Sequence, residues 1–206
     1  MGETAMRFAY SDPPYLGQGA RLYGDKHPHA HLWDDPETHR EHIDWLCREF
    51  PDGWALSASA PSLRVLLPMC PDDARTAAWV KSFSAFKKGV RPAYAWEPVI
   101  FWHGRNPSNG HPHKPPEKGG KQTTPKDFHV TEEDRWEVIV CPITLRKGLV
   151  GAKPEAFCEW VLDLLGFRPG DEVVDVFPGT GVMGRVVERR HKPVERSTET
   201  PVEEQD

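Results

Sequence analysis

The sequence predicts an α/β protein in which helices cover a mostly parallel β-sheet. Segments typical of strands alternate along the chain with segments that have the apolar period of helices. One strand segment, 172–177, is almost entirely apolar, as is typical of a strand buried in a parallel sheet. The 206 residues, of which 38% are hydrophobic, suffice for one domain with a lean core.

The first half of the chain supplies four of the strand segments. A strand over 7–11 runs into a Gly- and His-rich segment, 16–33, which has no clean period and is predicted to be a mobile loop. Asp35 then caps a helix with Pro36 at its first position. Its buried face is formed by Ile43, Leu46, Cys47 and Phe50. Strands over 54–59, 75–81 and 94–102 and a short helix over 61–69 follow.

The second half contains an interruption. Residues 104–126 include no Ala, Val, Ile, Leu, Met, Cys or aromatic residue, so this basic, Pro/Gly-rich stretch is predicted to be a surface insertion. Elements then resume with a strand over 136–143, a helix from Pro154 to a stop at Gly166, the strand 172–177 and a helix over 182–190. We therefore expect one domain over 1–190, with a disordered acidic tail over 191–206.

Composition and charge exclude several classes of protein. The net charge of −5 excludes a globally basic nucleic-acid coat. No apolar run approaches the roughly 20 residues of a membrane span, and the first ten residues lack a signal core, so a cytoplasmic protein is expected. The cysteines (Cys47, Cys70, Cys141 and Cys158) form no C-x-x-C pair and are predicted to be reduced thiols. No metal site is expected, although histidines alternate at 27, 29 and 31 and at 111 and 113.

The first chemical motif is Asp12-Pro13-Pro14-Tyr15, directly after the first strand. Its parts suit methylation of an exocyclic amino group, whose lone pair is delocalised into a base. Asp12 can accept one N–H and a backbone carbonyl of the proline pair can accept the other, which would draw the lone pair out of conjugation. Tyr15 can stack on the base. A plain Asp-Pro turn is the simpler alternative.

The second motif is Asp175-Val-Phe177-Pro178-Gly179-Thr180-Gly181, where a strand ends in a glycine turn that opens a helix. The turn's N–H groups suit a carboxylate and Asp175 suits an ammonium, so the motif is compatible with the methionine part of S-adenosylmethionine (SAM). The glycines, with Gly184, also match the G-x-G-x-x-G dinucleotide pattern. That alternative requires a second strand ending in an acid about 20 residues on. Glu195 and Glu199 are in range, but no strand precedes them.

Together, the two motifs resemble the amino-group DNA methyltransferases of permuted motif order, in which the catalytic motif comes first. The sequence is especially similar to small DNA adenine methylases of actinobacterial phages, and Gly151-Ala152-Lys153-Pro154 belongs to the resemblance. It implies a Rossmann-like SAM-dependent methyltransferase fold with SAM as cofactor, Lys153 and Asp12 near the cofactor, and adenine-N6 as target. The family's ribose-binding strand after the last helix is absent or unrecognisable in this sequence, so we expect a sheet of about five strands, shortened on that side.

The resemblance also implies double-stranded DNA as the partner. Between 81 and 126, nine basic residues oppose two acidic ones, which is enough local charge for phosphate contacts. The candidate DNA contacts are Lys87, Lys88, Arg91 and Arg105, with Arg21 and Tyr23 in a segment that could close over a flipped base. Cytosine-N4 or RNA adenine methylation, an inactive DNA- or partner-binding module, and a homodimer stay open as alternatives.

Two further sets of residues are interpreted as structural. Glu97, in the conspicuous Trp96-Glu97-Pro98, is interpreted as a structural acid. Four tryptophans are predicted to lie in the core, namely Trp45, Trp79, Trp102 and Trp160.

Overall fold

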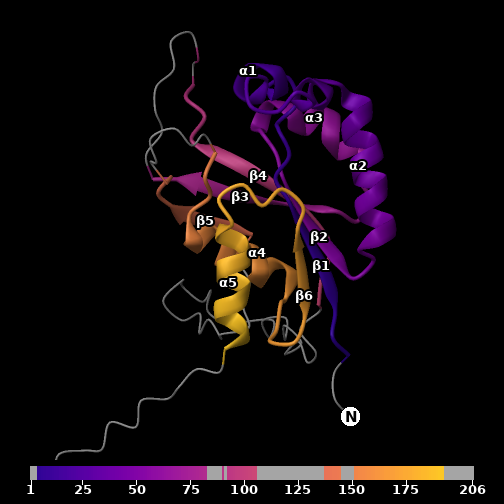
Figure 1. The fold of residues 1–206 in the computed structure, drawn as a ribbon, viewed down its shortest axis with the longest axis vertical. Helices are drawn as coiled ribbons and strands as arrows, with labels where there is room; N and C mark the ends of the chain where they lie inside the picture. The colour runs from indigo at the N-terminus through magenta and orange to yellow at the C-terminus, as the bar shows by residue number, and fades with distance from the viewer. Residues whose placement is uncertain (1–3, 83–89, 91, 106–136, 145–150, 193–206) are drawn as a thin grey trace, which may run out of the picture.

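The computed structural model describes residues 4–82, 90, 92–105, 137–144 and 151–192. Its centre is a six-stranded sheet of order β5-β3-β4-β2-β1-β6 (Figure 1). The strands are β1 (Arg7–Ser11), β2 (Gly53–Ser57), β3 (Arg75–Lys81), β4 (Trp96–His103), β5 (Val138–Cys141) and β6 (Glu172–Asp175). Only β4 runs against its neighbours, so the predicted mostly parallel sheet is confirmed, with six strands rather than about five.

Helices cover both faces of the sheet, as Figure 1 shows. On one face lie α4 (Glu155–Leu165) and α5 (Val182–His191), whose apolar sides share a core with Phe8 and Phe101. On the other lie α2 (Pro36–Glu49), capped by the Asp35 carboxylate as predicted, and α3 (Leu63–Leu66), flanked by the 3-10 turns η2 (Ala60–Ser62) and η3 (Leu67–Met69). The sheet therefore lies between two layers of helices, each packed on it through a hydrophobic core.

The segment 16–33, predicted to be a mobile loop, is instead folded into α1 (Gly19–Tyr23) and the beginning of the 3-10 turn η1 (Ala30–Asp34). The Asp34 carboxylate accepts hydrogen bonds from the backbone N–H of Gly19 at 2.7 Å and of Ala20 at 3.0 Å. A Cβ on Gly19 would lie 2.0 Å from the carbonyl oxygen of Ala30, so only glycine allows this approach. Side-chain hydrogen bonds, rather than an apolar period, order the segment.

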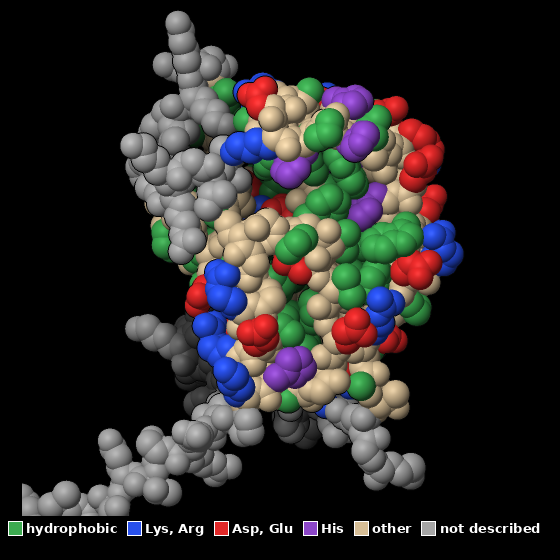
Figure 2. All heavy atoms as spheres, viewed as in Figure 1, with side chains coloured by type: hydrophobic (Ala, Val, Ile, Leu, Met, Phe, Trp, Pro, Cys, Tyr) green, Lys and Arg blue, Asp and Glu red, His purple; other side chains and the backbone are tan. Residues whose placement is uncertain are grey.

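Strand β6 also differs from its prediction. It was expected to be buried in the sheet, but it lies at the edge, where it pairs with β1, and Val173 and Val174 are only half-buried. Figure 2 shows apolar side chains gathered along this edge, between α5 and α2. Within the part of the chain that the structure describes, β6 is the last strand on this side, and residues 193–206, which follow α5, lie outside that part.

Most of the two predicted polar segments falls outside the described residues, including 106–126 of the insertion and 193–206 of the tail. The predicted core tryptophans divide into two groups. Trp79 and Trp160 are buried, whereas Trp45 and Trp102 are half-buried, and the most deeply buried tryptophan is Trp54 on β2.

Candidate active site

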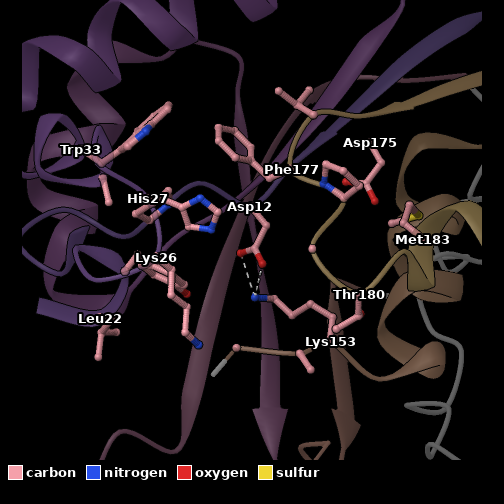
Figure 3. Close-up of a pocket in the computed structure, with 18 of the residues that line it drawn as sticks. Asp12, Leu22, Lys26, His27, Trp33, Lys153, Asp175, Phe177, Thr180 and Met183 are labelled. Atoms are coloured by element: carbon pink, nitrogen blue, oxygen red, sulfur yellow. Dashed lines mark hydrogen bonds and ion pairs between the residues drawn. The ribbon is translucent and has the colours of Figure 1, made fainter. Parts of the chain in front are cut away.

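The two sequence motifs line one cavity of about 720 Å³ at the carboxyl ends of β1 and β6 (Figure 3). Strands β1 and β6 are adjacent and parallel, so their carboxyl ends lie side by side. Asp12 follows β1 and Asp175 ends β6 there. The cavity is lined from the predicted set by Asp12, Pro14, Tyr23, Lys153, Asp175, Phe177, Pro178, Gly179 and Thr180. Residues far apart in sequence therefore form one site.

Asp12 is held by Lys153, which precedes α4. The Lys153 ammonium donates to both carboxylate oxygens of Asp12 at 2.8 Å (Figure 3). Burial raises the pKa of Asp12, an effect that Lys153 opposes. Burial alone would lower the pKa of Lys153, but the carboxylates of Asp12 and Glu97 more than offset it, so the pKa of Lys153 is raised and its ammonium stays charged.

Tyr15 lies behind this pair, outside the cavity lining. Its hydroxyl donates to Glu97 at 2.8 Å and accepts from Lys153 at 3.2 Å. Burial and the charges of Asp12 and Glu97 raise the Tyr15 pKa well above its usual value, so the phenol is neutral and available as a donor. The predicted stacking of Tyr15 on a base would therefore use a ring whose hydroxyl is already hydrogen-bonded to Glu97 and Lys153.

Glu97, interpreted from the sequence as structural, belongs to this site. It binds Lys81 of β3 in an ion pair and lies 3.9 Å from the Lys153 ammonium. Burial would raise its pKa, but Lys153 and Lys81 lower it. Because β4 runs antiparallel to the other strands, its amino end lies on the same side of the molecule as the carboxyl ends of β1 and β6. The sequence does not give a strand's direction, which is why this residue was missed.

Asp175 has an oxygen that lacks a hydrogen-bond partner among the described residues. Its Oδ1 atom is buried, while the backbone N–H of Phe177 donates to the carboxylate. Burial, together with the nearby Asp12 charge, raises the pKa of Asp175 to about 6. Because Asp175 also lines the cavity, its incompletely paired carboxylate is a place for a cationic group of a ligand.

The glycine turn after β6 has the backbone that its sequence predicts. Gly179 and Gly181 have φ of 45° and 68°, in the left-handed region that favours glycine. Gly181 then precedes α5 as its N-cap. Gly181 itself does not line the cavity, and neither does Pro13, which is buried.

The opposite wall of the cavity comes from the segment 16–33, which the sequence predicts to be a loop. Leu22, Tyr23, His27 and Trp33 line it, and Figure 3 shows Leu22, His27 and Trp33 across from the glycine turn. The Trp33 ring also contacts the ring of Phe177, with centroids 5.2 Å apart. The ordered 16–33 segment thus closes one side of the site.

His42 of α2 ties this wall to both motifs. Its Nε2 is 2.7 Å from the hydroxyl of Ser11, the residue before Asp12, and its ring contacts Trp33 and Phe177. Burial, with a smaller effect of His39, lowers the pKa of His42 to about 4, so the ring is neutral. No sequence pattern marked His42, because its partners lie on three separate segments.

The predicted DNA contacts are only partly placed. Arg21 is exposed on α1 and Tyr23 lines the cavity, while Lys87, Lys88 and Arg91 lie outside the described residues. Arg105 lies at the other end of the sheet, where its side chain is 11% exposed and forms an ion pair with Asp171. Arg105 is thus used inside the fold, which argues against its predicted contact with DNA.

Two other kinds of feature are absent from the described residues. No helix there is long and apolar enough to cross a membrane. In the same part of the chain, no group of three or more His, Cys, Asp or Glu side chains could hold a metal ion.

Comparisons with solved structures establish the class of fold. The chain is similar to M1.HpyAVI in its complex with SAM, with a TM-score of 0.51 and 15% identity over 91% of this chain and 80% of that one. It is also similar to TTHA0409 of Thermus thermophilus, a candidate DNA modification methylase, with a TM-score of 0.50 and 15% identity over 93% of this chain and 79% of that one. No protein-family model and no curated protein matches the chain. The predicted Rossmann-like methyltransferase fold is confirmed by this likeness.

Proposed function

We propose that the protein transfers a methyl group from SAM to the exocyclic N6 of adenine in DNA, in the cytoplasm of a bacterial or phage-infected cell. The observation that carries this proposal is the shared cavity. Asp12 and Pro14 of the first motif face it together with Asp175, Gly179 and Thr180 of the second. A donor of the methyl group and its acceptor can therefore meet in one place.

The residues of the glycine turn fit SAM as the cofactor. Its ammonium would meet the carboxylate of Asp175, and its carboxylate would meet backbone N–H groups of the turn residues that line the cavity, Gly179 and Thr180. The cavity of about 720 Å³ lies within the roughly 300–1,000 Å³ typical of cofactor sites. When bound, SAM supplies an electrophilic methyl group on a sulfonium. The charge of Asp175 would be balanced by the cofactor's net positive charge.

Asp12 and its proline pair would orient the amino group that is methylated. Asp12 accepts one N–H of the amine and a backbone carbonyl of Pro13 or Pro14 accepts the other, which turns the nitrogen lone pair toward the methyl group. After the N–C bond forms and the C–S bond breaks, Asp12 takes the proton that the methylated amine releases. Its pKa, raised by burial, suits this late proton transfer.

DNA and adenine are the finer parts of the proposal. DNA is supported by the description of TTHA0409 as a candidate DNA modification methylase and by the motif resemblance. Adenine is supported by Asp12, because a serine in the first motif position leans toward cytosine in the family. We propose that the target base is flipped toward Asp12 and Tyr15, with Arg21, Tyr23 and the basic residues Lys87, Lys88 and Arg91 contacting DNA.

The test is a methylation assay with SAM labelled in its methyl group and duplex DNA, followed by nucleoside analysis. We expect labelled N6-methyladenine. Labelled N4-methylcytosine, or label in RNA alone, would overturn the proposed target but keep the reaction class. Calorimetry with SAM tests the cofactor separately. The absence of binding at high micromolar SAM would favour an inactive DNA- or partner-binding module.

A further inference from the structure

Glu97 of β4 is a half-buried acid that the proposed methyl transfer does not use. Its side chain is 21% exposed, and it is surrounded by groups that the reaction does use. One carboxylate oxygen pairs with Lys81, and the other accepts from the Tyr15 hydroxyl at 2.8 Å and lies 3.9 Å from the Lys153 ammonium. Glu97 therefore contacts the back of the base site without lining the cavity.

We propose that Glu97 is a positioning residue of the methyl-transfer site, which fixes the Tyr15 ring and shares the Lys153 ammonium with Asp12. This inference rests on the proposed function, because it assigns Asp12 and Tyr15 their roles there. It adds a residue on a different strand, which neither motif contains. Glu97 acts through these neighbours and is not itself in contact with the reacting atoms.

The hydrogen bonds form a chain across the sheet edge. Lys81 donates to Glu97, the Tyr15 hydroxyl donates to Glu97, and Lys153 donates to Tyr15 and to Asp12. The phenol oxygen is thus held by two bonds of opposite sense, which fixes the direction of the ring. A ring held in this way can present a constant face to a base.

The same chain of hydrogen bonds determines which partners the Asp12 carboxylate has. Lys153 donates to both oxygens of Asp12 at 2.8 Å, so the carboxylate is occupied before any base arrives. When the target amine takes a lone pair of Asp12, Lys153 needs a second acceptor, and Glu97 is the carboxylate next in reach. With Lys81, the four groups carry two positive and two negative charges, so the shift leaves the local charge balanced.

The test compares Glu97→Gln with Lys81→Gln, which alter the two members of one ion pair. We expect Glu97→Gln to lower kcat roughly 10²-fold, with the Kd for SAM and the melting temperature nearly unchanged. The charge of Glu97 raises the pKa of Asp12, so its removal should move the acid limb of the kcat profile to lower pH. Lys81→Gln should move that limb to higher pH, because a positive charge is lost from the same cluster.

Glu137→Gln is the matched control, since Glu137 forms an exposed ion pair with Arg75 on the same sheet. It should leave kcat and its pH profile as in the wild type. A merely structural role for Glu97 predicts that Glu97→Gln and Lys81→Gln both lower the melting temperature and leave the profile in place. That result would overturn the proposal, as would a Glu97→Gln enzyme with wild-type kcat.

A second measurement does not depend on methylation. The four tyrosines can be replaced by 3-fluorotyrosine, and the ¹⁹F signal of Tyr15 identified by its loss in Tyr15→Phe. In Glu97→Gln this signal should shift and change its line width, whereas in Glu137→Gln it should not. An unchanged Tyr15 signal overturns the inference even if the wild type methylates DNA. A changed signal in a protein without methylation activity overturns the proposed function and keeps Glu97 as the group that fixes Tyr15.

Discussion

Two aspartates flank strand β6, and they differ in how fully the protein pairs their carboxylates. Asp171, just before the strand, is 3% exposed and accepts from the backbone N–H of Met6 at 2.9 Å and of Arg168 at 2.8 Å, while Arg105 pairs with it. Burial would raise its pKa, but these partners lower it. Asp175, at the other end, keeps a buried oxygen without a partner among the described residues, and its pKa is raised to about 6.

This difference separates an acid that completes the fold from an acid that waits for a ligand. Asp171 joins the amino end of β1 to the turn before β6, and all its charge is used within the protein. Asp175 makes the ligand-free protein less stable whenever it is ionised, because its charge is buried without a cation. A site that binds a cation stores this cost in the free protein and recovers it on binding.

The largest expected effect is at Asp12, which faces the same cavity as Asp175 but has a protein partner. Asp12→Asn should lower kcat by at least 10²-fold, because the amide is a weaker acceptor for the amine and cannot take its proton. SAM binding, measured by calorimetry, should change less than about 3-fold, on the order of 0.6 kcal/mol. Equal losses of turnover and of SAM affinity would contradict the role assigned to Asp12.

The fold-completing acid should behave in the opposite way. Asp171→Asn should lower the free energy of unfolding by about 3 kcal/mol, because it leaves the buried Arg105 charge without its carboxylate and one backbone N–H without an acceptor. Urea denaturation measures this loss. The Kd for SAM, determined on the folded protein, should stay at the wild-type value. A variant as stable as the wild type would remove the contrast between the two aspartates.

Asp175→Asn should weaken SAM binding by about 10–100-fold, as expected for a lost hydrogen bond to a charged group. The same change should raise the free energy of unfolding of the ligand-free protein at pH 8 by about 1–2 kcal/mol. The melting temperature should rise accordingly. The sign follows from the pKa of about 6, because a carboxyl that binds its proton more tightly when folded loses stability as pH rises through about 4 to 6. A destabilised Asp175→Asn protein at pH 8 would contradict this account.

That pKa also predicts a pH dependence of cofactor binding. In the wild type, SAM affinity should rise between pH 5 and pH 7, as Asp175 becomes ionised. In Asp175→Asn the affinity should be flat over this range. Calorimetry in two buffers at each pH gives both the affinity and the proton release, and a flat wild-type profile would show that the ammonium is bound elsewhere.

The sequence predicted the parts of the molecule that follow local rules. The Asp35 cap, the Gly166 stop and the glycine turn at Gly179–Gly181 were recognised because each depends on a few neighbouring residues. The edge position of β6 and the order in 16–33 were missed, since they depend on pairing and on Asp34, which is distant in sequence from Gly19.

The candidate site divides in the same way. Asp12 and Asp175 lie in short motifs and were found. Glu97 and His42 contact those motifs through space, and no spacing along the chain connects them. A sequence shows which residues follow a strand, but not the direction of the strand beside it, and this direction brings Glu97 to Tyr15.

The smallest expected effect tests the glycine turn against the dinucleotide pattern that its sequence also matches. In that pattern the third glycine, Gly184, is needed for close packing of helix on strand. Here Gly184 is exposed on α5, and a Cβ added to it would meet nothing within 4 Å. Gly184→Ala should therefore stabilise the protein by about 0.4–1 kcal/mol, through the higher helix propensity of alanine, with SAM binding unchanged. Gly181→Ala, at φ 68°, is the matched control and should destabilise the protein by about 1–2 kcal/mol. Thermal denaturation of both variants measures the difference, and a destabilised Gly184→Ala protein would return the dinucleotide interpretation to consideration.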